Sequence, residues 1–551
     1  MNPQKMNRNI FYSLIVFFNF SGLNAQIQSN RVTYIAEKIY QADTAFGTAT
    51  AMVVENGIIL YMGDVRTADS LYPTSTKKEF AGKYIYPGFI DAHCHFLAYS
   101  KGLTEVDLVG SKSEADVIKR AKKFAKKNKL PWLIGRGWDQ NDWAVKEFPN
   151  MQKLSKAFPD RPVCLSRIDG HAVWINAAAM KKLHLNPDTL IFGGEFVKVN
   201  GEFTGICIDN AADWVKSQLP SVPFSAWEKG LETGLTNCHA QGLTQIAEAG
   251  ISVADIDLIQ TLQAQNKLNL RIYGMLAVNE ENLGYISRNG MIYSDLFTMR
   301  SVKIYLDGAL GSRGALLKGD YCDQLGHKGL QIIDQPKFEM YQNFLLNKGF
   351  QICVHAIGDS ANAIALRTFN KYIPEGYDAR WRIEHAQIVN IKDQKMFSKR
   401  SIIPSVQPTH ATSDAPWANE RLCNADAKGA YAYQNLLKQA GTIALGTDFP
   451  VEGISPMHTF YSATQRMDAA GKLERPFIGE QALTRKQALW GMTLWAAYAN
   501  FDETRTGSLE ASKMADFVVM NTDIMEVEAP KILKAKVTHT FIGGKLVYGK
   551  P

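Results

Sequence analysis

Cysteine is scarce in this sequence of 551 residues and follows no recurring pattern. The seven cysteines stand far apart, and no Cys-x-x-Cys spacing joins any two of them. An odd number without such spacing excludes a disulfide framework, although one isolated disulfide is compatible with it. Beyond residue 25 the chain also lacks any apolar run near the roughly 18 residues that a membrane-spanning helix needs.

The sequence also has little net charge, because basic and acidic residues nearly balance. Lys5 and Arg8 are the only charged residues among the first 25, which leaves 59 basic against 54 acidic residues, an excess of +5. The one densely basic stretch, 119–129, contains Phe124 as its only aromatic residue. We expect this stretch to be the polar face of a helix, and we exclude nucleic-acid binding.

Glycine and proline are not enriched, and no internal repeat is visible, which excludes collagen-like, disordered and solenoid chains. A hydrophobic content of 46% and a charged content of 21% are those of an ordinary globular protein. A chain of 551 residues is too long for one compact core. We therefore expect two or three domains.

Residues 1–25 have the pattern of a secretory signal peptide. A basic start is followed by an apolar run over 10–20 and then by Ala25, a small residue of the kind that signal peptidase needs. The run is too short to span a bilayer core of about 30 Å, which disfavours the alternative of an uncleaved membrane anchor. No cysteine follows it, so lipidation is not expected. We predict an exported protein, in the periplasm, without a stable membrane anchor.

Short β-rich segments occupy both ends of the mature chain. Near the start, 31–80 alternates such runs with turns, including Glu55-Asn56-Gly57, and near the end a second tight turn is formed by Gly543-Gly544. Chain termini often lie close together. We expect one small β-sandwich built from 26–83 and 505–551, with two unrelated β extensions as the alternative.

Between these ends, short β-branched runs alternate with helical patterns. Eight such units predict an α/β fold, a (β/α)8 TIM barrel over 84–504, with a large insertion over about 98–240 after the first strand. The expected strands are 84–91, 243–249, 270–276, 301–307, 350–356, 381–386, 402–407 and 442–448, and the clearest helices are 256–264, 338–346, 361–372 and 434–440.

Polar residues with metal-binding chemistry stand at the ends of these strands. His93 and His95 follow the first strand, and side chains two residues apart on an extended chain face the same way. His355, His385 and Asp448 end the fifth, sixth and eighth strands. Catalytic groups of a TIM barrel gather at the carboxyl ends of its strands. Four histidines and a carboxylate suit zinc or another divalent transition metal.

Lys303, on the fourth strand, is unusual beside such a cluster because an ammonium group repels a cation. Carboxylation by carbon dioxide would convert this side chain into a carbamate that bridges two metals. The alternative is an ordinary ion pair with Asp307.

These residues, in this order, resemble the metal-dependent amidohydrolase superfamily. Seven sequence motifs resemble its amidohydrolase family 3 branch, which includes N-substituted formamide deformylases. These motifs are YPGFIDAHCHF, RGWDQNDW, RIDGHAVWINAAA, VKIYLDGALGSRGA, VHAIGD, RIEHAQ and LGTDFPV. The resemblance implies a mononuclear or binuclear zinc site held by six residues: His93, His95, Lys303 as an N6-carboxylated lysine, His355, His385 and Asp448. One departure is GLTQIAEAG, where members often have a histidine and an aspartate and this chain has Ala247 and Glu248.

The resemblance also suggests roles in catalysis. We expect Asp448 to be the general base that receives the proton of a metal-activated water and passes it to the leaving nitrogen. His171, within the insertion, and His410, after the seventh strand, are candidates for polarising the substrate carbonyl, and each has an ordinary surface histidine as its alternative. Four carboxylates are placed either to support ligands or to form ordinary ion pairs: Asp91, Asp307, Asp359 and Glu384.

The predicted function is therefore hydrolysis of a carbon–nitrogen bond outside peptides, in an amide, formamide or N-acyl compound. Two alternatives remain, a deaminase of the same superfamily and a catalytically silent binding protein that keeps the barrel. The expected partner is a small-molecule amide, with a second copy of the chain in a homodimer as a further option. The insertion shapes the pocket, so the sequence does not identify the substrate.

Overall fold

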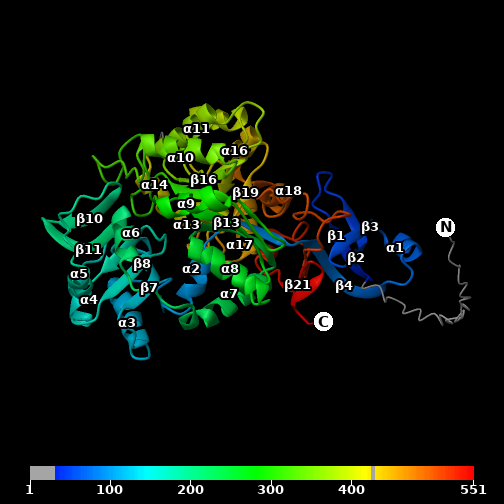
Figure 1. The fold of residues 1–551 in the computed structure, drawn as a ribbon, viewed down its shortest axis with the longest axis horizontal. Helices are drawn as coiled ribbons and strands as arrows, with labels where there is room; N and C mark the ends of the chain where they lie inside the picture. Colours follow the sequence, from blue (N-terminus) through cyan, green and yellow to red (C-terminus); the bar gives the residue numbers. More distant parts are fainter. Residues whose placement is uncertain (1–30, 424–427, 551) are drawn as a thin grey trace, which may run out of the picture.

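A computed structural model describes residues 31–423 and 428–550, which form three sheets surrounded by helices (Figure 1). The expected signal peptide at 1–25 lies outside the described residues. Within the described ranges, no helix is both long and apolar enough to cross a membrane.

The central sheet is a nearly closed barrel of eight parallel strands, as expected from the sequence. Its order begins at β5 and ends at β19, and backbone bonds bring these two edges together: Asp448 N donates to His93 O at 2.7 Å, and His95 N donates to Phe449 O at 2.8 Å. The strands are β5 (Phe89–Cys94), β12 (Leu243–Ile251), β13 (Arg271–Ala277), β15 (Phe297–Tyr305), β16 (Gln351–Ala356), β17 (Trp381–His385), β18 (Ile402–Val406) and β19 (Ala444–Leu445).

Successive residues of each strand face opposite sides of the barrel wall. On β15, Val302 and Ile304 belong to the large apolar core outside the wall, so the buried Ser301 and Lys303 face the interior. This alternation explains why the strands read as almost continuous apolar runs with single polar residues. It also places Lys303 on the inner surface.

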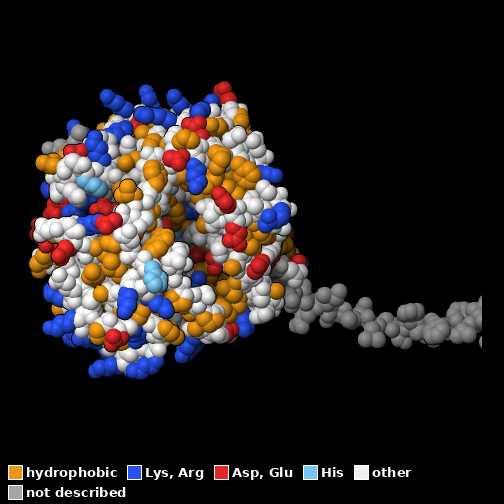
Figure 2. Space-filling model, turned by 60° about the vertical axis from the view of Figure 1, so that its left-hand side comes forward, with side chains coloured by type: hydrophobic (Ala, Val, Ile, Leu, Met, Phe, Trp, Pro, Cys, Tyr) orange, Lys and Arg blue, Asp and Glu red, His pale blue; other side chains and the backbone are white. Residues whose placement is uncertain are grey.

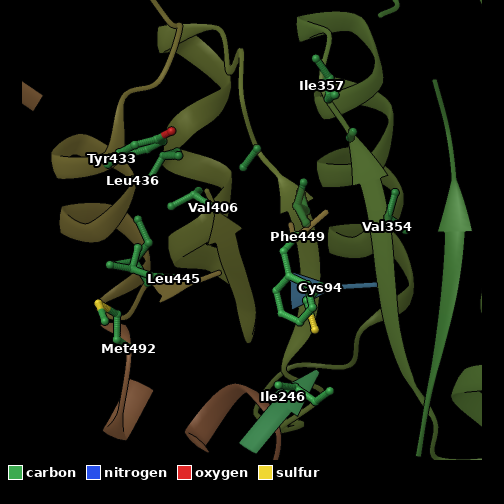
Figure 3. Close-up of a cluster of buried hydrophobic side chains, with 14 of the residues drawn as sticks. Cys94, Ile246, Val354, Ile357, Val406, Tyr433, Leu436, Leu445, Phe449 and Met492 are labelled. Atoms are coloured by element: carbon green, nitrogen blue, oxygen red, sulfur yellow. The ribbon is translucent and has the colours of Figure 1, made fainter. Parts of the chain in front are cut away.

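Helices cover the outer face of the barrel. In Figure 3, Val406 of β18 and Leu445 of β19 lie beside Tyr433 and Leu436 of α16, and all four side chains are fully or almost fully buried. The helices that follow barrel strands are α8 (Val253–Ala264), α9 (Glu280–Asn289), α10 (Gln335–Asn347), α11 (Asp359–Tyr372), α13 (Pro408–Asp414), α16 (Tyr433–Ala440), α17 (Pro456–Gln465), α18 (Arg485–Gly491) and α19 (Leu494–Ala499). The four helices singled out in the sequence occur within a few residues of their predicted bounds.

The first barrel strand begins later than the predicted 84–91. Residues 84–87 end β4 (Thr76–Pro87), which pairs with β20 (Phe517–Met520) in the terminal sheet, and β5 starts at Phe89. Gly88 lies between the two strands, where a Cβ atom would collide with the Thr244 side chain. The chain passes from one sheet to the other at this glycine.

Strands from both chain ends pair in one seven-stranded sheet and are not two unrelated extensions, but they form a single sheet where a β-sandwich was expected. Figure 1 shows this sheet beside the barrel, with the blue N-terminal strands next to the red C-terminal ones. Its order is β22 (Lys545–Tyr548), β21 (Val537–Ile542), β20, β4, β1 (Arg31–Tyr40), β2 (Thr48–Glu55) and β3 (Ile58–Gly63), and the short helices α1 (Val65–Leu71) and α20 (Ala529–Ile532) accompany it.

The insertion after β5 has its own six-stranded sheet and its own apolar core. The insertion lies beyond one end of the barrel in Figure 1, and Figure 2 turns it forward, with a hollow near the middle of that face. Its strands are β10 (Gly194–Val199), β11 (Glu202–Asp209), β9 (Ala172–Ile175), β8 (Val163–Arg167), β7 (Leu133–Trp138) and β6 (Val106–Asp107), with helices α3 (Glu114–Ala125), α4 (Met151–Ala157), α5 (Ala177–Lys182) and α6 (Asn210–Ser217).

The helix that ends the insertion belongs to the barrel by its contacts. α7 (Glu228–Ala240) packs against α2 (Phe96–Gly102) and β12 rather than against the insertion's sheet. The separate sheet therefore occupies less of the chain than the expected 98–240.

One disulfide joins Cys322, in the long loop after β15, to Cys423, which follows α14 (Ala418–Arg421). The other five cysteines are free and buried. The isolated bond that the cysteine pattern left open is thus present.

Candidate metal centre

Three of the expected ligands converge where strands of the barrel end. His93 lies near the end of β5, His385 ends β17 and Asp448 lies beyond β19, and one ligand atom of each lies within 4.8 Å of the others. All three residues are buried. These nitrogen and oxygen donors form a compact set of the kind that zinc or a related divalent cation binds.

His93 is oriented by a chain of buried polar groups. Its Nδ1 lies 2.5 Å from Glu384 Oε2, and Glu384 Oε1 lies 2.7 Å from Arg382 Nε. Arg382 also donates to Asn500 Oδ1 at 3.0 Å. With Nδ1 engaged, Nε2 faces the cluster, 3.6 Å from Asp448 Oδ1. Burial, reinforced by the Lys303 cation, lowers the pKa of His93 to about 4, which keeps the ring neutral as a ligand must be.

His95 contacts the same carboxylate oxygen as His93. Its Nε2 lies 3.2 Å from Asp448 Oδ1, while Nδ1 bonds to Ala249 O at 3.0 Å. The departure noted at Glu248 has a structural role here, because this buried carboxylate accepts the backbone N–H groups of Phe96 and Leu97. Glu248 therefore fixes the turn that carries His95 rather than supplying a ligand.

His355 completes a row of imidazoles with His385, whose ring centroid lies 4.4 Å away. The His355 Nε2 atom lies 3.4 Å from Gly308 O, so its other ring nitrogen is the one left for a ligand role. Burial holds the pKa of both rings well below the usual range. Both are therefore neutral donors.

Lys303 lies inside the cluster and not in an ion pair with Asp307. Its Nζ is 3.2 Å from His93 Nε2 and 4.9 Å from the centre of the Tyr305 ring. Asp307 instead accepts backbone N–H groups from Ile357, at 3.0 Å, and Gly358, at 2.7 Å. Burial lowers the pKa of Lys303 to about 8, so a substantial fraction of the amine is neutral near physiological pH.

The four carboxylates expected around the ligands differ in the groups to which they hydrogen-bond. Glu384 bonds to a ligand side chain, as described above. Asp91 accepts the Thr447 hydroxyl at 2.6 Å and so ties β5 to the segment before Asp448. Asp359 accepts the backbone N–H of Lys318. Asp307 and Asp359 thus fix loops above the strand ends.

The two further candidate histidines lie on opposite sides of the cluster. His410, on α13, stacks on His385 with ring centroids 5.8 Å apart, and its Nε2 is 3.5 Å from Asp448 Oδ2. His171 reaches in from the insertion, and its ring centroid lies 5.0 Å from that of His355. Neither is an isolated surface histidine.

A divalent cation fits the residues present. Within the described part of the chain, the buried His385 Nδ1 has no hydrogen-bond partner, and Asp448 Oδ1 has no polar side-chain neighbours beyond the imidazoles of His95 and His93. Unpaired buried polar atoms are costly and call for an ion or a water. The donors beside them are neutral imidazoles and an ionised carboxylate, the forms that bind a cation.

The sequence did not reveal three residues that the structure places around this centre. Arg382 is completely buried behind Glu384, Tyr305 lies between Lys303 and His171, and Asp209 bonds to His171. The spacing of two residues from Lys303 to Tyr305 was a readable signal, because both then face the same side of β15. Asp209 is 38 residues from its partner and carries no comparable signal.

Comparison with known proteins identifies the family of this chain. A family model described as the Amidohydrolase family matches residues 80–548. The protein LONG AFTER FAR-RED 3 of Arabidopsis thaliana is 29% identical over 93% of this chain and 90% of its own length. The N-substituted formamide deformylase of Arthrobacter pascens is 22% identical over 95% of this chain and 99% of its own length.

Among solved structures, an uncharacterized metal-dependent hydrolase from Pyrococcus horikoshii has a TM-score of 0.75 at 24% identity, with 91% of this chain and 99% of that chain covered. This likeness supports the barrel fold. The family match spans the barrel, the insertion and the C-terminal strands of the terminal sheet. The chain therefore belongs to the amidohydrolase family.

Proposed function

We propose that this protein hydrolyses a carbon–nitrogen bond outside peptides, in an N-acyl, formamide or cyclic amide compound. The observation that carries the proposal is the convergence of His93, His385 and Asp448 beside Lys303 at the carboxyl ends of the barrel strands. Catalytic groups of TIM-barrel enzymes collect at this end. The likeness to a formamide deformylase supports this class of bond.

The cation that we propose is zinc, held by His93, His95, His355, His385 and Asp448, with Lys303 as an additional ligand once carboxylated. A divalent cation bound there would lower the pKa of a water molecule and polarise a carbonyl group. Whether one or two ions bind depends on Lys303, because its carbamate form would supply an additional pair of oxygens.

Asp448 is the general base in this proposal. Although burial opposes the charged form, the neighbouring His95 and His93 hold the pKa of Asp448 far below its usual range. The carboxylate is therefore ionised and able to take a proton from the attacking water at Oδ2, the oxygen that faces His410. It returns this proton to the nitrogen that leaves.

His171 is placed to act on the opposite side of the substrate. Burial opposes its charge, but the bond to Asp209 outweighs burial and raises the pKa of His171. A protonated ring donates from Nε2 to the oxygen of the scissile carbonyl, which stabilises the negative charge that develops there. His410 lies beside the second oxygen of Asp448, with its Nε2 at 3.5 Å from Oδ2.

We also propose that the protein is exported to the periplasm. The pattern of residues 1–25 supports this, and so does the Cys322–Cys423 disulfide, because such bonds persist in oxidising compartments. N-terminal sequencing of protein from the periplasmic fraction tests it. We expect the mature chain to begin at Gln26, and a chain that retains Met1 in the cytoplasm would contradict export.

The experiment that tests the function is a hydrolysis screen of the zinc-loaded mature protein. The compounds are N-formyl, N-acetyl and longer N-acyl amines, with cyclic amides and aminated heterocycles in the same plate. Release of a free amine from an amide is the expected result. Ammonia released from heterocycles alone would identify a deaminase, and turnover that survives a chelator would contradict the metal mechanism.

A further inference from the structure

The insertion contributes a histidine and an aspartate that adjacent strands hold in register. His171 immediately precedes β9, Asp209 ends β11, and the backbone N–H of Asp209 donates to His171 O at 2.8 Å. The side chains of the two residues also meet, with His171 Nδ1 at 2.7 Å from Asp209 Oδ1. The sheet pairing therefore fixes the distance between the carboxylate and the ring.

The backbone at Asp209 is strained in a way that serves this contact. Its φ of 49° and ψ of −122° lie in a region that non-glycine residues rarely occupy. Backbone strain of this kind persists only where the surroundings enforce it, and it clusters at functional sites. The conformation turns the carboxylate, which is completely buried, toward the barrel.

The long loop after β15 is shaped around this carboxylate. A Cβ atom on Gly308 or on Gly314 would collide with Asp209. Both glycines belong to the DGALGSRGA segment, whose glycines the metal site itself does not explain. The insertion thus docks on the barrel through a carboxylate that occupies space left by two glycines.

The free edge of the His171 ring faces the metal centre. The ring centroid is 5.0 Å from that of His355 and 6.2 Å from that of Tyr305, and 15% of the side chain remains accessible. Since Nδ1 is bound to Asp209, Nε2 is the ring nitrogen left to face a substrate.

We propose that Asp209 is a positioning residue that fixes the orientation of the His171 ring, so that Nε2 meets the scissile carbonyl of the substrate. Gly308 and Gly314 contribute to the same arrangement, because their lack of side chains leaves room for the Asp209 carboxylate. This proposal rests on the proposed amide hydrolysis. The active site is then completed only when the insertion is docked on the barrel.

The test compares Asp209→Asn, His171→Gln and the double variant by steady-state kinetics on the best substrate of the screen. We expect each single change to lower kcat about 100-fold or more, with KM altered less than about threefold and metal content unchanged. If Asp209 acts through His171, the double variant loses no more than His171→Gln alone. A double variant that loses the product of both factors would overturn the proposal.

Two matched controls separate positioning from a general loss of structure. Gly314→Ala should reproduce the fall in kcat, whereas Gly284→Ala, on α9, meets only the flexible end of Arg288 and should leave kcat unchanged. Asp188→Asn, an exposed acid of the insertion, should also leave it unchanged. Equal effects of Gly314→Ala and Gly284→Ala would contradict the role assigned to the glycine pair.

A spectroscopic readout distinguishes failure of this inference from failure of the proposed function. In protein with 15N-labelled histidine, the His171 Nδ1–H proton should resonate at low field because it is bound to a carboxylate, and Asp209→Asn should remove that signal. If no amide is hydrolysed but the signal behaves as described, the function is wrong and the pairing is real. If the signal is unaffected by Asp209→Asn, the positioning role is wrong.

Discussion

At the scale of single residues, the candidate centre depends on groups that set the state of each ligand. His93 offers Nε2 to the cluster because Glu384 holds Nδ1, and Glu384 is itself held by Arg382. Burial lowers the pKa of His93, His355 and His385 and keeps these rings neutral, while hydrogen bonding from His95 helps to hold the pKa of Asp448 well below its usual range. The same low dielectric environment that would penalise an isolated charge thus prepares the donors for a cation.

Replacement of Glu384 tests this dependence. Glu384→Gln removes the carboxylate that orients His93, and we expect a 10- to 100-fold weaker affinity for zinc, as is typical of groups behind metal ligands. Titration of the chelator-stripped protein with zinc measures it. The matched control is Glu339→Gln, on the outer helix α10, which should leave the affinity unchanged. Equal affinities for Glu384→Gln and wild type would contradict the orienting role.

Asp448→Asn addresses the general base. An amide keeps the shape of the side chain but takes up a proton poorly, so kcat should fall by about 100-fold or more. We expect the zinc content to remain, because the histidines still bind the ion. Steady-state kinetics and metal analysis of the same preparation give both quantities. A kcat near the wild-type value would reject Asp448 as the base.

Lys303 should show a pH-dependent reaction with carbon dioxide. Only the neutral amine forms a carbamate, and with a pKa of about 8 its neutral fraction rises as pH increases through 8 rather than through the usual value of 10.5. 13C NMR at constant dissolved 13CO2 should therefore show a carbamate signal that grows between about pH 7 and 9. The signal must be absent from Lys303→Met. A signal that persists in that variant would arise from another amine.

At the scale of strands and helices, the pattern of buried runs predicted most of the barrel. Lys303 on β15 and His355 on β16 stood out because each interrupts a run whose neighbours are buried on both faces of the wall. The start of the first strand was missed because Tyr86 and Phe89 look alike in sequence although they belong to different sheets. Only the close packing at Gly88 marks the passage between them.

The contact between the barrel and the terminal sheet gives a prediction about stability. Arg271 of β13 donates to Asp516 at 2.5 Å through Nε and at 3.1 Å through Nη2, and both side chains are buried. Arg271→Ala leaves the buried Asp516 carboxylate without its cationic partner. We expect the free energy of unfolding to fall by about 3–5 kcal/mol, measured by urea denaturation.

The control for this stability prediction is Arg31→Ala. It breaks a partly exposed pair with Glu55 within the terminal sheet and should cost less than about 1 kcal/mol. Similar losses of unfolding free energy in the two variants would show that the buried Arg271–Asp516 pair contributes no more to stability than the partly exposed pair does. A similar metal content in both would show that the site itself is intact.

At the scale of the whole molecule, the sheet of the insertion meets the barrel at the candidate centre, whereas the terminal sheet lies on another side of the barrel (Figure 1). The order of strands and six candidate ligand positions could be predicted because such residues recur near strand ends along the chain, and three of the six, His93, His385 and Asp448, converge in the structure. Asp209 and the sheet of the insertion were not, because mixed pairing brings together segments such as β9 and β11 without a regular repeat. The substrate pocket depends on that docking, and for this reason its shape was not predictable.

The disulfide gives a prediction at the same scale. Cys322 and Cys423 are 101 residues apart, and the bond restrains the unfolded chain over that length. Cys322→Ser should lower the free energy of unfolding by about 2–5 kcal/mol in oxidised protein. A reductant should destabilise the wild type but not the variant. An equal response of both to the reductant would contradict a structural role for the bond.

The central claim is that buried side chains from β5, β17 and the segment after β19 bind a divalent metal ion. Its most direct test is metal analysis of the chain from residue 26 after incubation with zinc and removal of free ions. We predict at least one equivalent of zinc for the wild type and a loss of most of it in a His93→Ala/His385→Ala variant that remains folded. Less than about a tenth of an equivalent in the wild type, or the same content in the variant, would contradict the account.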